Sequence, residues 1–102
     1  MKNLETKICS IPYYRRDQYE ILREQSVDKE NFSISYDEMA AITETTRLDM
    51  ENRGYKVIKI NVDMVELIEW AASQHFKLNP ESRTRFAMKK LKVIISSQSI
   101  DA

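Results

Sequence analysis

The sequence predicts an α+β domain that is mostly helical, with its elements in the order α-α-β-α-α around one central strand. One glycine and two prolines among 102 residues leave too few turn residues for an all-β sandwich. The segment YKVIKINV, which begins at Tyr55 and ends at Val62, is rich in β-branched residues and is typical of a strand. Three helix-start signals lie around it: Ser35 with Glu38, Asp63 with Glu66, and Asn79 with Pro80 and Glu81.

Each helix follows from its start signal and its apolar spacing. Ser35 and Glu38 match a capping box, and the helix that they open runs to Arg53, because Gly54 suits the left-handed position after a helix end. The other two signals predict helices over 64–75 and 80–95. Ahead of these, Tyr19, Leu22 and Ser26 share one helical face, which predicts a first helix over 14–26.

The central strand needs a partner, because a lone strand cannot satisfy its own backbone groups. That partner is either the Lys7–Tyr13 arm, as a short N-terminal strand, or the same strand of another copy. We otherwise interpret residues 1–12 as an arm in which Pro12 ends any regular element. Residues 13–95 form a single globular domain in this interpretation, and residues 96–102 a flexible tail.

The small number of cysteine and histidine residues limits the kinds of site that one chain can form. One cysteine, Cys9, and one histidine, His75, are too few for a disulfide or a Cys/His zinc site within one chain. We therefore assign no catalytic residue, no metal ligand and no cofactor, and expect a reduced cytoplasmic protein without a membrane segment. Enzymatic activity would require an acidic side chain and a second catalytic group to meet in one pocket. The acids concerned are Asp37, Glu38 and Asp63, and the second group would be His75 or Tyr14.

The formal net charge is zero, but it is unevenly distributed. Residues 28–76 carry −5 and residues 77–102 carry +4. The cations of the last helix are read either as a solvated or internally paired face, or as contacts to a partner or to nucleic acid. In the second case the helices over 64–75 and 80–95 form a helix-turn-helix-like pair with a basic second helix. The residues concerned are Arg83, Arg85, Lys89 and Lys92.

A second candidate cluster lies at the start of the first helix. It comprises Tyr13, Tyr14, Arg15 and Arg16. Tyrosine and arginine are enriched in the hot spots of protein interfaces, so the cluster is a candidate interaction site. The alternative is that the tyrosines pack against the helix start while the arginines are solvated.

Several short motifs carry a family resemblance. They are Tyr13-Tyr14-Arg15, Tyr36-Asp37-Glu38, Gly54-Tyr55-Lys56-Val57, Asp63 with Glu66-Leu67 and Trp70, and Arg83 with Arg85-Phe86-Ala87. With these motifs, residues 13–91 resemble a widespread group of small, uncharacterised bacterial proteins. The resemblance implies a small stand-alone bacterial protein and implies no catalytic residue.

These observations predict a non-enzymatic cytoplasmic protein that acts through protein–protein contacts. The expected partner is a second copy, giving a homodimer, or another protein. The alternative function is a nucleic-acid-binding regulator that uses the basic last helix.

Overall fold

The computed structural model describes residues 7–100, with side chains described for residues 7–97. Residues 1–6 of the predicted arm and residues 101–102 of the predicted tail lie outside the described residues. The described elements are β1 (Lys7–Tyr13), α1 (Arg16–Gln25), the 3-10 turn η1 (Lys29–Phe32), α2 (Tyr36–Asn52), β2 (Tyr55–Asn61), α3 (Met64–Ser73) and α4 (Pro80–Ile100). The predicted α+β, mostly helical class is confirmed.

The sheet consists of β1 and β2 in parallel, in a register that pairs Lys7 with Tyr55 and Tyr13 with Asn61. The N-terminal arm is therefore a partner of the central strand. The chain reaches β2 from β1 through α1, η1 and α2, a crossover of the length that parallel neighbours require.

Pro12 lies inside β1, so our expectation that it ends any regular element is wrong. The backbone groups of successive strand residues point to opposite sides. Tyr13 bonds to β2, because its carbonyl accepts a hydrogen bond from the Val62 amide at 3.0 Å. The Pro12 nitrogen therefore faces the free edge of β1, where a missing N–H costs no ladder hydrogen bond.

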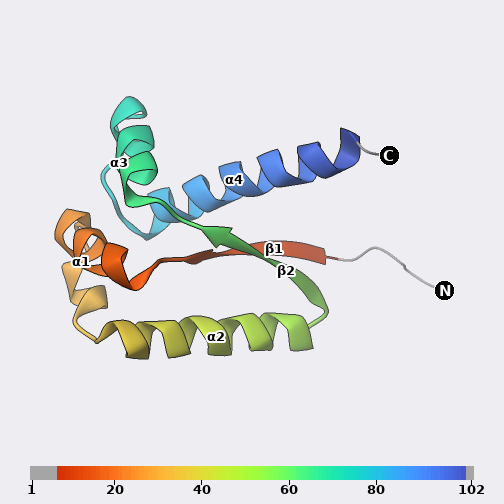
Figure 1. Ribbon diagram of the computed structural model, residues 1–102, viewed down its shortest axis with the longest axis horizontal. Helices are drawn as coiled ribbons and strands as arrows, with labels where there is room; N and C mark the ends of the chain where they lie inside the picture. Colours follow the sequence, from red (N-terminus) through yellow and green to blue (C-terminus); the bar gives the residue numbers. More distant parts are fainter. Residues whose placement is uncertain (1–6, 101–102) are drawn as a thin grey trace.

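Two helices cover the two faces of this narrow sheet. In Figure 1, α2 runs along one side of the strands and α4 along the other, while α1 and α3 gather at one end. Residues of β1 confirm the assignment of faces. Ser10 contacts Met88 of α4, and Tyr13 contacts Glu44 of α2.

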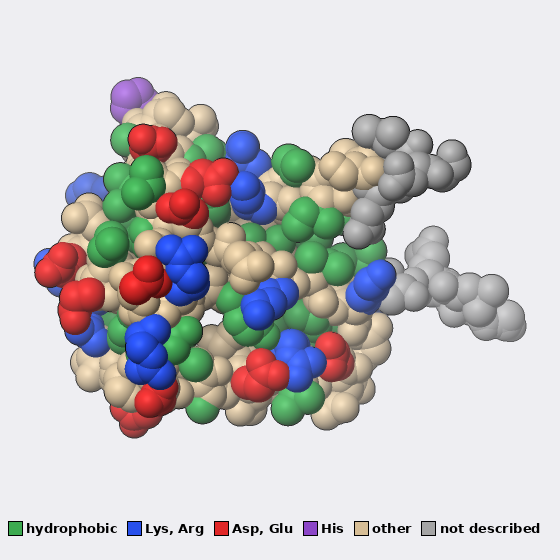
Figure 2. Space-filling view, viewed as in Figure 1, with side chains coloured by type: hydrophobic (Ala, Val, Ile, Leu, Met, Phe, Trp, Pro, Cys, Tyr) green, Lys and Arg blue, Asp and Glu red, His purple; other side chains and the backbone are tan. Residues whose placement is uncertain are grey.

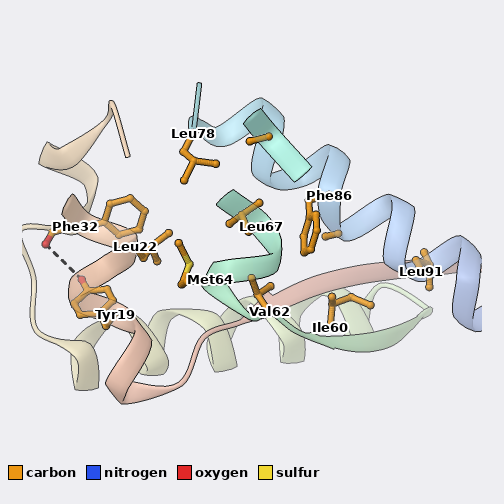
Figure 3. Packing of buried hydrophobic residues seen from close by; sticks show 12 residues of the cluster. Tyr19, Leu22, Phe32, Ile60, Val62, Met64, Leu67, Leu78, Phe86 and Leu91 are labelled. Carbon is orange, nitrogen blue, oxygen red and sulfur yellow. Dashed lines mark hydrogen bonds between the residues drawn. The ribbon is translucent and has the colours of Figure 1, made fainter. Parts of the chain in front are cut away.

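The main core lies between the sheet, α4 and the paired ends of α1 and α3. Figure 3 shows Phe86 and Leu91 of α4 beside Ile60 of β2 and Val62, which directly follows this strand. Both Ile60 and Val62 are buried. These two residues alternate with Asn61, so one face of the strand is directed into the core. The remaining buried apolar side chains of the core cluster are Tyr19, Leu22, Phe32, Met64, Leu67, Ala71, Leu78 and Ala87.

The α2 helix differs from the others because none of its residues is buried. The predicted capping box is present: the Glu38 amide donates to Ser35 Oγ at 3.1 Å, and the Ser35 amide donates to Glu38 Oε1 at 3.0 Å. The helix presents half-buried residues to the sheet, among them Met39 and Thr43. Its packing is therefore shallow along its whole length.

Three boundaries or faces differ from the expectations. The α1 helix begins at Arg16 rather than Tyr14, because Arg15 is still extended, at φ −74° and ψ 157°. The α4 helix continues to Ile100 instead of ending near residue 95, since no glycine or proline follows to stop it. The α3 helix is apolar around most of its circumference, a pattern that predicts burial on two sides. It nevertheless leaves Val65 61% exposed, because it lies at one end of the molecule.

Candidate functional site

Tyr13 lies at the carboxyl end of β1, on the sheet face that α2 covers. Its hydroxyl donates to Glu44 Oε2 at 3.2 Å. The Lys59 ammonium lies 4.6 Å from the centroid of its ring, within the range of a cation–π contact. Desolvation raises the pKa of the Tyr13 hydroxyl, and the hydrogen bond to Glu44 raises it further. Tyr13 therefore links β1 to both α2 and β2.

Tyr14 is half-buried and packs against the core. Burial raises the pKa of its hydroxyl to about 12, so it stays protonated at neutral pH. Its backbone carbonyl accepts a hydrogen bond of 2.7 Å from the Tyr36 hydroxyl. Tyr36 also meets the Tyr19 ring edge-on, at 5.7 Å between centroids. These contacts fix the start of α1 against the start of α2.

Arg15 and Arg16 are exposed, and each is paired with an acid nearby. Arg15 bonds Asp17 at 3.1 Å, and Arg16 bonds Asp37 at 2.5 Å while lying 4.7 Å from the Tyr36 ring centroid. A shallow hollow of about 150 Å³ opens beside the cluster. It is lined by Tyr13, Tyr14, Arg15, Tyr36, Lys59 and Asn61.

Arg83, one of the candidate contacts to a partner or to nucleic acid, is held inside the fold by an internal ion pair. Its guanidinium binds both carboxylate oxygens of Asp28, at 3.0 and 2.6 Å, and also donates to Ser26 Oγ at 3.1 Å. It lies 4.9 Å from the Phe32 ring centroid. Only 11% of each charged side chain is exposed. The hydrogen bonds from Arg83 lower the pKa of Asp28 to about 2, so this pair joins α4 to the loop after α1.

The other predicted cations of α4 remain on its surface. Arg85 pairs with Glu81 at 2.9 Å, and both Lys89 and Lys92 are exposed. Lys90 reaches back to Glu66 of α3 at 2.8 Å. Together with the Arg83–Asp28 pair, this places two contacts between the basic end and the acidic middle within one chain. Figure 2 shows basic and acidic side chains interleaved on one face, with hydrophobic side chains exposed among them.

The turn between α3 and α4 buries the residues that a recognition helix would use first. Asn79 caps α4, because its Oδ1 accepts from the Ser82 amide at 2.9 Å. Ser82 is 3% exposed, and its hydroxyl donates to the Lys77 carbonyl at 2.7 Å. Ser82 and Arg83 therefore serve the packing of this end of α4, and Arg85 is its first exposed cation.

Three residues of types that enzymes use have structural settings here: Cys9, His75 and Asp63. Burial raises the pKa of the half-buried Cys9 thiol, which disfavours the nucleophilic thiolate. His75 is exposed in a turn at φ 63°. Asp63 accepts from the Val65 amide at 2.8 Å and so caps α3. Within residues 7–97, no group of three His, Cys, Asp or Glu side chains could hold a metal ion.

Sequence reasoning missed the exposed apolar surface. On α2, Ile42 is 58% exposed. Leu48 on the same helix is also exposed, as its place among acidic residues in the sequence indicates. A mainly apolar groove of about 360 Å³ lies between α3, the end of α1 and the turn that follows α3. Val27 and Phe76 are among its lining residues. The helical periodicity of α2 contained the signal for Ile42, but it could not distinguish an inner face from an outer one. Val27 and Phe76 lie outside the helices, so no periodic pattern reports their exposure.

Comparisons with protein-family models, with curated proteins and with solved structures found no match to this chain. Among the helices that the structure describes, none is both long and apolar enough to cross a membrane.

Proposed function

We propose that this chain is a non-enzymatic protein that acts through protein–protein contacts, and that its first partner is a second copy of itself. The observation that supports this proposal is the shallow packing of one of the two helices that cover the sheet. A two-stranded sheet is marginal alone, and parallel sheets occur almost always with both faces covered. Here one covering helix, α2, has no buried residue and exposes Ile42 and Leu48.

Sedimentation equilibrium over a range of concentrations tests this proposal. The monomer mass is 12.1 kDa, so a homodimer should appear as a mass near twice this value at high micromolar concentration. A single species of monomer mass throughout that range would contradict the homodimer. The proposal includes a cytoplasmic location, which the lone thiol Cys9 supports, because reducing compartments keep cysteines free.

The alternative, a nucleic-acid-binding regulator, is supported by the exposed cations Arg85, Lys89 and Lys92 on α4. The engagement of Arg83 by Asp28 weakens it. A gel-shift assay at low salt with duplex and single-stranded probes decides between the two. Binding that is lost in a Lys89→Glu, Lys92→Glu variant would favour the regulator, and no binding to any probe would remove it.

A further inference from the structure

The free edge of β2 presents backbone groups that no strand within residues 7–100 pairs with. In the register of the sheet, the Tyr13 carbonyl bonds to the amide of Val62. Alternation along a strand then directs the even-numbered residues of β2 toward β1. The amides and carbonyls of Val57 and Lys59 point the opposite way, and no other strand in the described part of the chain pairs with this edge.

The two edges of the sheet are not equivalent. The free edge of β1 includes Pro12, which has no N–H to donate to a further strand. The β2 edge is YKVIKIN, with high strand propensity and a full set of donors and acceptors. Lysines often protect such edges, but the Lys59 ammonium lies 4.6 Å from the Tyr13 ring centroid. It therefore lies across its own sheet and leaves the edge open.

We propose that β2 pairs antiparallel with β2 of a second copy, about a two-fold axis at Ile58, to form a four-stranded sheet. This inference rests on the proposed self-association and specifies its interface. A strand that pairs with its own copy needs no partner beyond this chain, and antiparallel pairing satisfies the outward groups of both copies.

The axis at Ile58 follows from charge and register. It places Val57 opposite the partner's Lys59 and Tyr55 opposite the partner's Asn61, so every outward residue of the strand is used. An axis at Lys59 would place two ammonium groups directly opposite each other, which is destabilising. An axis at Val57 would leave Asn61 beyond the end of the partner strand.

The dimensions of the helices fit the same arrangement. Strands are spaced about 4.8 Å apart, so each two-stranded sheet adds about 10 Å to the width of the combined sheet. One helix covers each face in each copy (Figure 1). Pairing of β2 edges therefore places α2 beside α2 and α4 beside α4 at about 10 Å, within the usual range of helix packing. Ile42 on α2 is exposed in the single chain and becomes available for these contacts.

Cysteine cross-linking tests the register directly. In a Cys9→Ser background, the Ile58→Cys variant places two thiols at the axis, in a position where cross-strand disulfides form. Mild copper-catalysed oxidation should then convert most of the chain to a covalent dimer on a non-reducing gel. Lys56→Cys is the matched control, because its side chain lies on the same face and is separated from its copy by four residues, about 13 Å along the strand.

The outcomes separate this inference from the proposed function. Cross-linking at residue 58 and not at 56 supports the β2 interface. Equal cross-linking at both positions, or none at 58 in a chain that sediments as a dimer, overturns the interface and leaves self-association standing. Sedimentation as a monomer overturns both. Circular dichroism of each variant checks that the fold is intact.

Discussion

The Arg83–Asp28 pair shows how one residue can change role between sequence and structure. Arg83 has the spacing of a surface cation, yet its partner lies 55 residues earlier in the chain. No local pattern reports a contact of that kind, because it depends on how α4 lies against the loop after α1. Asp28 gives no local signal either, because its partner lies in α4, far along the sequence.

Removal of the acid should therefore destabilise the fold. In the Asp28→Asn variant the Arg83 guanidinium keeps its charge but loses its ionic partner, and both side chains are only 11% exposed. Breaking a buried pair from one side costs about 3 kcal/mol or more of unfolding free energy. Urea unfolding monitored by circular dichroism measures this change.

An exposed pair on the same helix provides the control. Glu81→Gln removes the partner of Arg85, whose side chain is 57% exposed, so it should cost less than about 1 kcal/mol. Similar losses from Asp28→Asn and Glu81→Gln would show that the buried pair contributes no more than a surface pair.

The lowered pKa of Asp28 predicts that the stability of the fold depends on pH. This pKa falls from 3.8 to about 2 in the folded chain, so between these values the unfolded chain binds more protons. The stabilisation is therefore present above pH 4 and is lost as the pH falls toward 2. Between pH 5 and pH 3, the difference in unfolding free energy between the native chain and Asp28→Asn should shrink by about 1 kcal/mol. A difference that stays constant over this range would contradict the assignment.

At the scale of elements, start signals were predicted well and partners were not. Caps at Ser35, Asp63 and Asn79 act within four residues, so the sequence places three helix starts correctly. Strand pairing is non-local, which is why the sequence left two partners open for β2. Pro12 misled the prediction, because its effect depends on which edge of a strand its nitrogen faces.

The α2 helix should depend on its cap more than a buried helix does. Ser35→Ala removes the hydroxyl that accepts from the Glu38 amide, a change that costs about 1 kcal/mol. Because α2 has no buried residue, this loss should also speed amide hydrogen exchange throughout α2 while leaving α4 unchanged. Ser33→Ala is the control, since the Ser33 hydroxyl bonds only the Glu30 carbonyl outside the helix. Equal exchange in the two variants would argue against a role for the cap.

At the scale of the whole molecule, the fold accounts for an elongated shape and for the internal pairing of opposite charges. The radius of gyration is 15.1 Å, compared with about 13 Å for a compact chain of this length. The extents of 48 × 30 × 21 Å reflect long helices on a narrow sheet. Some of the opposite charges also pair within one chain. Asp28 and Glu66 of the acidic middle bind Arg83 and Lys90 of the basic end.

If two such molecules share one sheet, their thermal stability should depend on concentration. Mass action favours the folded dimer, so the midpoint of thermal unfolding should rise by several degrees between about 2 and 200 µM chain. Val57→Pro is the matched variant. It removes one N–H from the free edge of β2 but no hydrogen bond between β1 and β2, so its midpoint should stay constant with concentration. A concentration-independent midpoint in the native chain would contradict coupled folding and association. A rise of equal size in Val57→Pro would mean that the two copies meet through another surface.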